Sequence, residues 1–160
     1  MKTNIGLAEQ DRKDVDNILN TVLSDEYVLY TKTRNYHWNV TGPQFNDLHA
    51  FFETQYTQLN GVIDEVAERA RALDGNAFGT LTEFVQHTRL GEQPNSSPSA
   101  REMVANLLQD HETLIRHLRV DLDTCAVAIT TQVPVIFSPA SRNGTKRWRG
   151  CSGLCCTVNN

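Results

Sequence analysis

The chain has 160 residues, a length that suits one domain with a sizeable core. Its apolar fraction of 39% is slightly low for a lone globule and fits amphipathic helices with an extensive polar surface. Residues 1–14 contain no apolar run, and no stretch approaches 18 apolar residues. We therefore expect no secretory signal and no membrane span, and a cytoplasmic location.

The net charge of −4 is unevenly distributed along the chain. Residues 1–123 hold 11 basic and 19 acidic residues, whereas residues 124–160 hold four basic residues and no acidic one. A negative body does not attract DNA, but a basic tail can. The charge pattern therefore gives DNA binding only weak support, and confines it to the tail.

Residues 1–10 are predicted to form a mobile N-terminal arm, and residues 11–125 a helical domain. The first long helix is expected over residues 11–39, because its apolar residues recur at helical spacing. Gly42 and Pro43 then favour a turn between two antiparallel helices. The second helix is predicted from about Asn46 to Leu73, with Gly75 as its end.

A long connection is predicted between the second and third long helices, with a short helix over residues 80–87. Ser99 and Glu102 have the spacing of a capping box, so the third long helix should begin there and run to about Thr124. A crossover of this kind is typical of one class of four-helix bundle. The sequence therefore predicts an all-α fold.

Residues 126–160 are anomalous at the position of a fourth helix. They are rich in β-branched residues, carry Pro134 and Pro139, and end in a region with three glycines and three cysteines. Internal proline strongly disfavours helix. The abrupt change of composition suggests a shifted reading frame, so the fourth helix is doubtful. Cys151, Cys155 and Cys156 resemble half of a zinc site, without a second half.

Residues 34–69 carry two histidines and three carboxylates at spacings that suit metal binding. His37 and His49 lie on either side of the predicted turn, which would bring them side by side. At about 100° per residue, the candidate ligands of the second helix fall in one stripe roughly 100° wide. These residues are His49, Glu53, Asp64 and Glu68.

His49 and Asp64 would lie roughly 22 Å apart along the helix axis, too far for one metal centre. The stripe makes sense if a second chain packs antiparallel across a two-fold axis. His37, His49 and Glu53 of one chain would then face Asp64 and Glu68 of the other. A dimer would hold two equivalent sites. Mixed imidazole and carboxylate ligands suit iron, and also zinc.

These residues resemble the ferroxidase segment of the Dps family, the ferritin-like DNA-binding proteins of starved bacterial cells. The match comprises the pattern H-W-N-V-x-G-x-x-F at residues 37–45, then His49, Glu53, Asp64 and A-E-R at residues 67–69. The family often has Asp where Glu53 stands, which is a conservative change for a metal ligand. The resemblance covers residues 11–125 and stops after Cys125.

The resemblance implies a ferritin-like four-helix bundle that assembles into a hollow dodecamer of two-fold dimers. It implies a ferroxidase that oxidises Fe(II), preferably with hydrogen peroxide, and stores the ferric mineral, protecting the cell and its DNA. Iron would occupy a dinuclear site between chains, formed by His37, His49, Glu53, Asp64 and Glu68. Trp38 and Tyr36, which flank His37, would be redox neighbours or packing residues.

Two other functions are compatible with the sequence. The chain could form a DNA-compacting, nucleoid-associated shell whose metal site matters little, or a zinc-stabilised dimer without a redox role. Ferritin-like proteins that build the site within one chain use Glu-x-x-His, and no Glu here has His three residues later. The between-chain site is therefore preferred.

Overall fold

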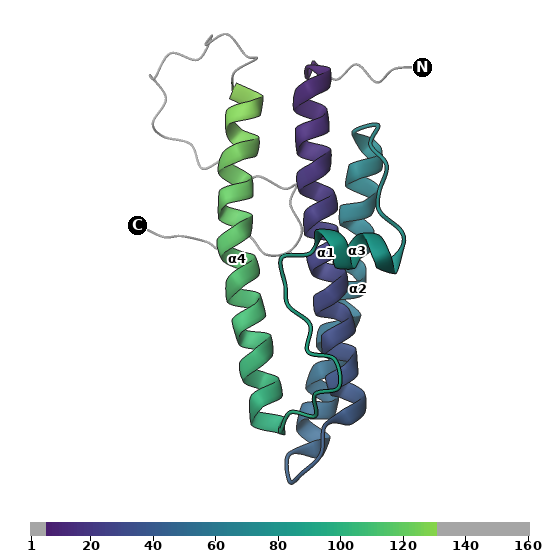
Figure 1. The fold of residues 1–160 in the computed structure, drawn as a ribbon, viewed down its shortest axis with the longest axis vertical. Helices are drawn as coiled ribbons and strands as arrows, with labels where there is room; N and C mark the ends of the chain where they lie inside the picture. The colour runs from purple at the N-terminus through teal and green to yellow at the C-terminus, as the bar shows by residue number, and fades with distance from the viewer. Residues whose placement is uncertain (1–5, 131–160) are drawn as a thin grey trace.

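The computed structural model describes residues 6–130, and within that range it contains four helices and no strand. The helices are α1 (Glu9–Asn39), α2 (Phe45–Ala72), α3 (Leu81–His87) and α4 (Ala100–Thr130). The three long helices lie side by side, and short α3 lies across α1 and α2 near mid-height, on the side away from α4 (Figure 1). The predicted all-α bundle with a short helix in its crossover is confirmed.

The helix boundaries differ from the sequence prediction at both ends of the domain. Helix α1 begins at Glu9, so the last two residues of the predicted N-terminal arm are helical. Helix α4 runs to Thr130, about six residues beyond its predicted end, because β-branched residues each lower helix propensity only modestly. The segment predicted to be anomalous, 126–160, therefore begins as helix. Its remainder, with the doubtful fourth helix and the three cysteines, lies outside the described residues.

Capping boxes start both helices of the second half. Thr80 accepts from the backbone N–H of Glu83 at 3.3 Å, and the Glu83 carboxylate accepts from the backbone N–H of Thr80 at 2.9 Å. Ser99 and Glu102 make the same pair of bonds at 3.4 and 2.7 Å. The capping box predicted at Ser99 is therefore confirmed. Each box satisfies backbone donors that a helix start leaves unpaired.

The turn between α1 and α2 uses the residues that the sequence indicated. Gly42 has a φ of +105°, a left-handed conformation that side chains rarely adopt. Its carbonyl accepts from the backbone N–H of Phe45 at 3.1 Å. The two long helices therefore reverse direction within five residues, which places the end of α1 beside the start of α2.

The end of α2 differs from the prediction. The residue with left-handed backbone is Asp74, at φ +68°, and not Gly75. Gly75 is needed for another reason: a Cβ there would overlap the side-chain carboxylate of Asp16 on α1. Asn20, one turn further along α1, donates to the carbonyl of Asn76 at 3.2 Å and accepts from the N–H of Phe78 at 2.8 Å. Helix α1 thus holds the loop that leads to α3.

Two adjoining hydrophobic clusters form the core. The larger one joins α1, α2, α4 and the crossover through Val28, Leu29, Tyr36, Val40, Phe52, Leu90, Met103, Leu107 and Leu114. The smaller one joins α1, α2 and α3 through Val22, Leu23, Val66 and Phe84. Helix α1 contributes to both clusters and contacts each of the other three helices. It is therefore the central element of the described fold.

Helix α4 keeps one apolar side exposed. Leu108, Ile115 and Leu122 recur every seven residues and are 59%, 39% and 56% exposed. Residues seven apart lie on the same side of a helix, so they form one stripe along α4. The three long helices that the structure describes leave this stripe exposed.

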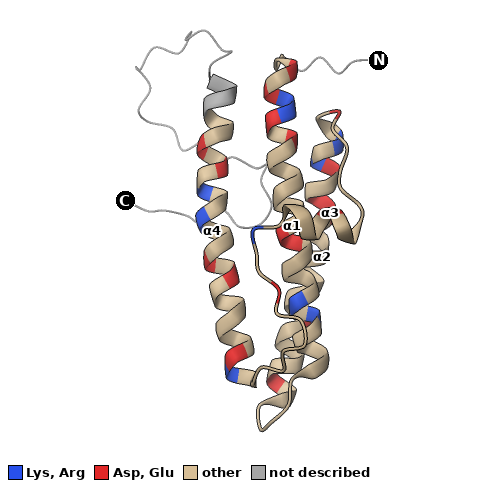
Figure 2. Cartoon of the chain, viewed as in Figure 1, with Lys and Arg blue, Asp and Glu red and all other residues tan. Residues whose placement is uncertain are grey.

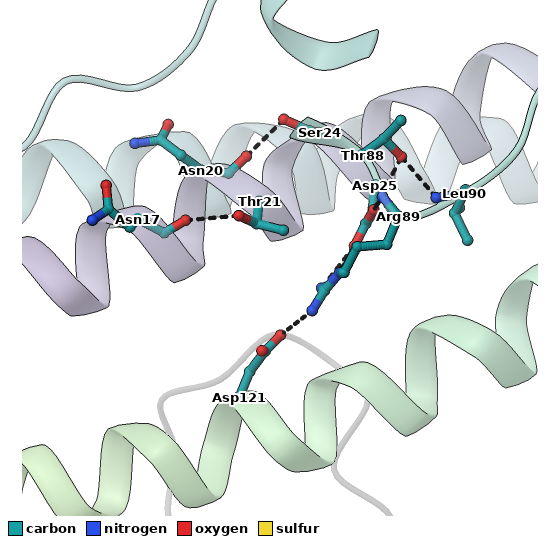
Figure 3. A network of polar contacts seen from close by, with 9 residues as sticks. All are labelled: Asn17, Asn20, Thr21, Ser24, Asp25, Thr88, Arg89, Leu90 and Asp121. Carbon is teal, nitrogen blue, oxygen red and sulfur yellow. Dashed lines mark hydrogen bonds and ion pairs between the residues drawn. The ribbon is translucent and has the colours of Figure 1, made fainter. Parts of the chain in front are cut away.

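A polar network joins α1, the crossover and α4 (Figure 3). Asp25 on α1 is fully buried and accepts from the backbone N–H and the guanidinium of Arg89, at 2.6 and 2.7 Å, and from the Thr88 hydroxyl at 3.0 Å. Arg89 also pairs with Asp121 on α4 at 2.8 Å. Burial opposes the charge on Arg89, but its hydrogen bonds to Asp121 and Asp25 outweigh that effect and raise its pKa.

Candidate metal centre

Two imidazole rings meet where α1 ends and α2 begins. His37 and His49 are stacked, with ring centroids 3.8 Å apart and an interplanar angle of 25°. The Nδ1 atom of each ring lies 2.9 Å from the backbone carbonyl oxygen of the other histidine. The prediction that these two side chains lie side by side is confirmed.

The reciprocal hydrogen bonds decide what the rings can do chemically. A carbonyl oxygen only accepts, so each Nδ1 must carry the proton that it donates. The proton-bearing Nδ1 leaves the Nε2 lone pair of each neutral ring available for a metal ion. A histidine whose other nitrogen donates to a backbone carbonyl has the arrangement commonly found for metal ligands.

Aromatic rings fix the imidazole pair from both sides. Phe45 stacks on His49 with centroids 5.0 Å apart, and the edge of Tyr56 meets His37 at 5.2 Å. His37 is buried, at 9% exposure, and His49 is half-buried. The pair is thus held in one orientation with limited access to water.

The three predicted carboxylate ligands all lie on α2 and are exposed. Glu53 follows His49 by about one turn, whereas Asp64 and Glu68 lie several turns further along. Within residues 6–130, no group of three His, Cys, Asp or Glu side chains is gathered closely enough to hold a metal ion. One chain therefore brings the two histidines together, but within the described residues it gathers none of Glu53, Asp64 and Glu68 with them into a group of three ligands.

Arg34 occupies a cluster of aromatic rings beside the histidines. Its guanidinium carbon lies 5.8, 5.1 and 5.6 Å from the ring centroids of Tyr30, Trp38 and Tyr56. It also donates a hydrogen bond of 2.6 Å to the Tyr30 hydroxyl. Arg34 precedes His37 by three residues, so this cluster places a permanent positive charge about one helical turn from His37.

The two predicted redox neighbours have different environments. Trp38 is 64% exposed and lies beneath Arg34. Tyr36 is buried, its ring packs against Phe52 at 6.2 Å, and its hydroxyl accepts from the Asn106 amide at 3.1 Å. Tyr36 thus points into the core. The ring that meets His37 is Tyr56, seven residues after His49, and this two-turn spacing was the signal in the sequence that could have indicated it.

The charge distribution of the described chain is predominantly acidic. Residues 6–130 hold 10 Lys and Arg against 19 Asp and Glu. Both signs are interspersed along the three long helices (Figure 2). Within this range, no helix combines the length and hydropathy needed to cross a membrane.

Comparisons with known proteins agree with this geometry. The protein-family model of the ferritin-like domain matches residues 17–128 of this chain. An uncharacterised low temperature-induced protein of Nostoc is 48% identical over 76% of this chain and 68% of its own length. A DNA protection during starvation protein of Brevibacillus brevis is 38% identical over 66% of this chain and 70% of its own.

A solved structure shares the fold of this chain. A Dps protein from Vibrio cholerae, described as a member of a broad superfamily of ferritin-like diiron-carboxylate proteins, superposes with a TM-score of 0.75. The sequence identity is 31%, and the match covers 82% of each chain. The chain therefore belongs to the ferritin-like family and is a Dps-type member of it.

Proposed function

We propose that this chain is the subunit of a ferroxidase that stores iron and removes peroxide. The observation that carries the proposal is the reciprocal pairing of His37 and His49, which leaves two Nε2 lone pairs available at one end of the bundle. A metal-ligating histidine usually donates its other ring N–H to a backbone carbonyl or a carboxylate, and both rings here have that arrangement.

The site is completed by a second chain. His37, His49 and Glu53 come from one protomer, and Asp64 and Glu68 from its two-fold partner. This proposal is supported by the separation of the two groups along α2 and by the exposure of all three carboxylates. A two-fold contact generates two such sites in each dimer. We propose that these dimers assemble further into a hollow dodecamer.

Iron is the substrate at this site. Two Fe(II) ions each give one electron to hydrogen peroxide, which takes up two protons and leaves as two water molecules. Because peroxide receives both electrons, its O–O bond breaks without releasing a hydroxyl radical. Oxygen ligands from carboxylates favour the harder Fe(III) product, and the two imidazoles bind Fe(II) first. Iron is preferred over zinc because the similar Vibrio cholerae protein is described as a diiron-carboxylate protein.

A role in DNA protection is suggested by the names of several relatives, which are called DNA protection during starvation proteins. The described part of this chain is acidic, so it would repel the phosphate backbone. We propose that this chain protects DNA by removing Fe(II) and peroxide. Compaction of DNA by direct binding is the alternative, and a gel shift with the full chain distinguishes the two.

The test of the proposed function is anaerobic loading with Fe(II), followed by peroxide, with absorbance of the ferric product recorded in the near ultraviolet. The wild-type protein should oxidise iron rapidly, and His49→Ala should lose the fast phase. His87→Ala is the matched control, because His87 is exposed on α3, where its Nδ1 lies within hydrogen-bond distance of the Glu83 carbonyl oxygen and its ring packs on Phe78. Equal rates for wild type and His49→Ala would refute the ligand assignment.

A further inference from the structure

One side of α4 carries a row of side chains at alternating spacings of four and three residues. All members of the row but one are apolar, and each is half-buried or exposed. A repeat of this kind keeps a narrow seam along one side of a helix and is typical of a helix that pairs lengthwise with another helix. The seam consists of Val104, Leu108, His111, Ile115, Leu118 and Leu122, and Cys125 takes the next position of the same repeat.

The seam is continuous with the core of its own chain. Leu118 packs against both hydrophobic clusters, whereas Leu108 and Leu122 are 59% and 56% exposed. His111 is the polar member, and burial lowers the pKa of its imidazole although the neighbouring Asp110 opposes that shift. The ring is therefore neutral at pH 7, the form that lies against apolar side chains at the smaller cost.

Two charged residues flank the seam on the side away from α1. Glu112 and Arg119 are both exposed, and seven residues separate them, so they lie on the same side of α4. The other flank is already occupied within the chain, because Leu114 is buried in the core and Asp121 pairs with Arg89. A helix that docks on the seam would therefore meet Glu112 and Arg119.

We propose that this seam binds the same seam of a second copy of the chain, with the two α4 helices antiparallel. Across such a two-fold contact, Glu112 faces Arg119 of the partner subunit, and symmetry repeats the pair with the roles exchanged. In a parallel pair, Glu112 and Arg119 would instead lie opposite Leu107 and Leu114 of the partner subunit, and neither would gain an opposite charge.

The same charges select one register of the antiparallel pair. With Glu112 opposite Arg119, Ile115 meets Leu118 of the partner subunit and Leu108 meets Cys125. A shift of one heptad in either direction would place two copies of Glu112, or two copies of Arg119, opposite each other. Like charges at that distance repel, so both shifted registers are disfavoured.

This contact is separate from the proposed metal site. Helix α4 lies on the other side of α1 from α2, the helix that carries Glu53, Asp64 and Glu68 (Figure 1). The contact removes apolar side chains of both copies from water, and it needs no metal ion. The inference therefore goes beyond the proposed function and is tested with protein to which no iron has been added.

The register is tested by disulfide formation in the full-length protein under mild oxidation, with the linked peptides identified by mass spectrometry. Leu108→Cys should link to Cys125 of the partner subunit. Residues 108 and 125 lie 17 positions apart on one helix, about 25 Å, so this link cannot form within one chain.

Two further cysteine substitutions are the matched controls, and each should link to Cys125 several-fold less than Leu108→Cys does. Ile115→Cys would meet Cys125 of the partner subunit only in a register shifted by one heptad. Val120→Cys replaces an apolar residue of α4 that is 62% exposed and lies outside the seam.

Charge reversal tests the two ion pairs. In the Leu108→Cys protein, Glu112→Arg and Arg119→Glu should each lower the rate of the link to Cys125 several-fold, because each places like charges opposite each other. An equal mixture of these two variants should restore most of the rate, since a mixed pair has opposite charges at both contacts. Mixing would not repair a substitution that only weakens folding.

Three results would overturn the proposal. The first is a link from Leu108→Cys to Cys151, Cys155 or Cys156, which would show that residues 131–160 cover the seam. The second is a link to Cys125 that is absent in Leu108→Cys, or no stronger there than in Ile115→Cys and Val120→Cys. The third is a mixture of Glu112→Arg and Arg119→Glu that links no faster than either variant alone.

Discussion

The guanidinium of Arg89 lies between the buried carboxylate of Asp25 and the carboxylate of Asp121, 2.7 Å from the one and 2.8 Å from the other. Asp25 belongs to α1, Asp121 to α4, and Arg89 to the connection that joins α3 to α4. One side chain therefore fixes the crossover at the level where three elements meet (Figure 3). This contact anchors the segment between α3 and α4, which contains no helix or strand.

Arg89→Ala should destabilise the protein by roughly 3–5 kcal/mol, since it leaves the Asp25 carboxylate buried without its charged partner. The measurement is urea unfolding at several protein concentrations, because assembly also contributes to apparent stability. Arg116→Ala is the control: its pair with Glu112 is largely exposed, with 3.9 Å between charged atoms, and should matter by less than about 1 kcal/mol. Equal losses in the two variants would contradict a special role for Arg89.

Glu26 should make stability depend on pH. Burial raises its pKa to about 7, and the neighbouring Asp25 adds to the shift. The native state thus holds a proton that the unfolded state has released, so the free energy of unfolding falls as pH rises from about 4.5 to 7. The loss is at most about 3 kcal/mol. Glu26→Gln should flatten this part of the pH profile.

The control for Glu26 is Glu112→Gln, a substitution on the exposed side of α4. Its pH profile should parallel that of the wild type. Thermal unfolding between pH 4.5 and 8 measures all three proteins. A profile for Glu26→Gln with the same slope as the wild type would show that another group carries the proton.

Local spacing predicted the elements of this fold well. The Ser99 capping box, the Gly42 turn and the helical periodicity each involve residues a few positions apart, where backbone geometry alone limits the outcome. The stacking of His37 and His49 follows from the same turn. These features could be read from the sequence because each depends on one segment of chain.

Long-range contacts could not be predicted in the same way. The charge network joins residues 25, 89 and 121, and the ring of Tyr56 on α2 meets the ring of Tyr30 on α1. Neither has a sequence spacing that distinguishes it from ordinary surface charges or core aromatics. Tyr36 was proposed as a redox neighbour because it precedes His37, but successive helical residues point about 100° apart, and its side chain enters the core.

Gly75→Ala tests the contact between α1 and the loop after α2. The added Cβ would overlap the Asp16 carboxylate, whose pKa is raised by burial although the backbone of Asn76 donates to it. We expect a destabilisation of about 1–3 kcal/mol, as for other overpacked sites. Gly79→Ala is the matched control, because nothing lies within 4 Å of its added Cβ. The double variant Asp16→Ala/Gly75→Ala should recover part of the loss.

Mixing two inactive variants tests the between-chain site directly. His49→Ala and Asp64→Ala should each lose fast Fe(II) oxidation, because each removes a ligand from both sites of a dimer. In a mixed dimer, one site lacks both ligands and the other keeps both. Random re-pairing of equal amounts after dissociation should therefore restore about a quarter of the wild-type sites.

The mixing experiment is controlled by re-pairing each variant with itself, which should restore nothing. Mixed samples of His49→Ala and Glu53→Ala should also stay inactive, because both residues would belong to the same half of the site. No chain in that mixture carries this half intact, so re-pairing cannot complete a site. In that mixture each site takes its histidines and Glu53 from one chain, which always lacks one of them. Recovery in that mixture would place His49 and Glu53 on different chains, and no recovery of His49→Ala with Asp64→Ala would place all of the ligands within one chain. Either result would refute the proposed division of the site.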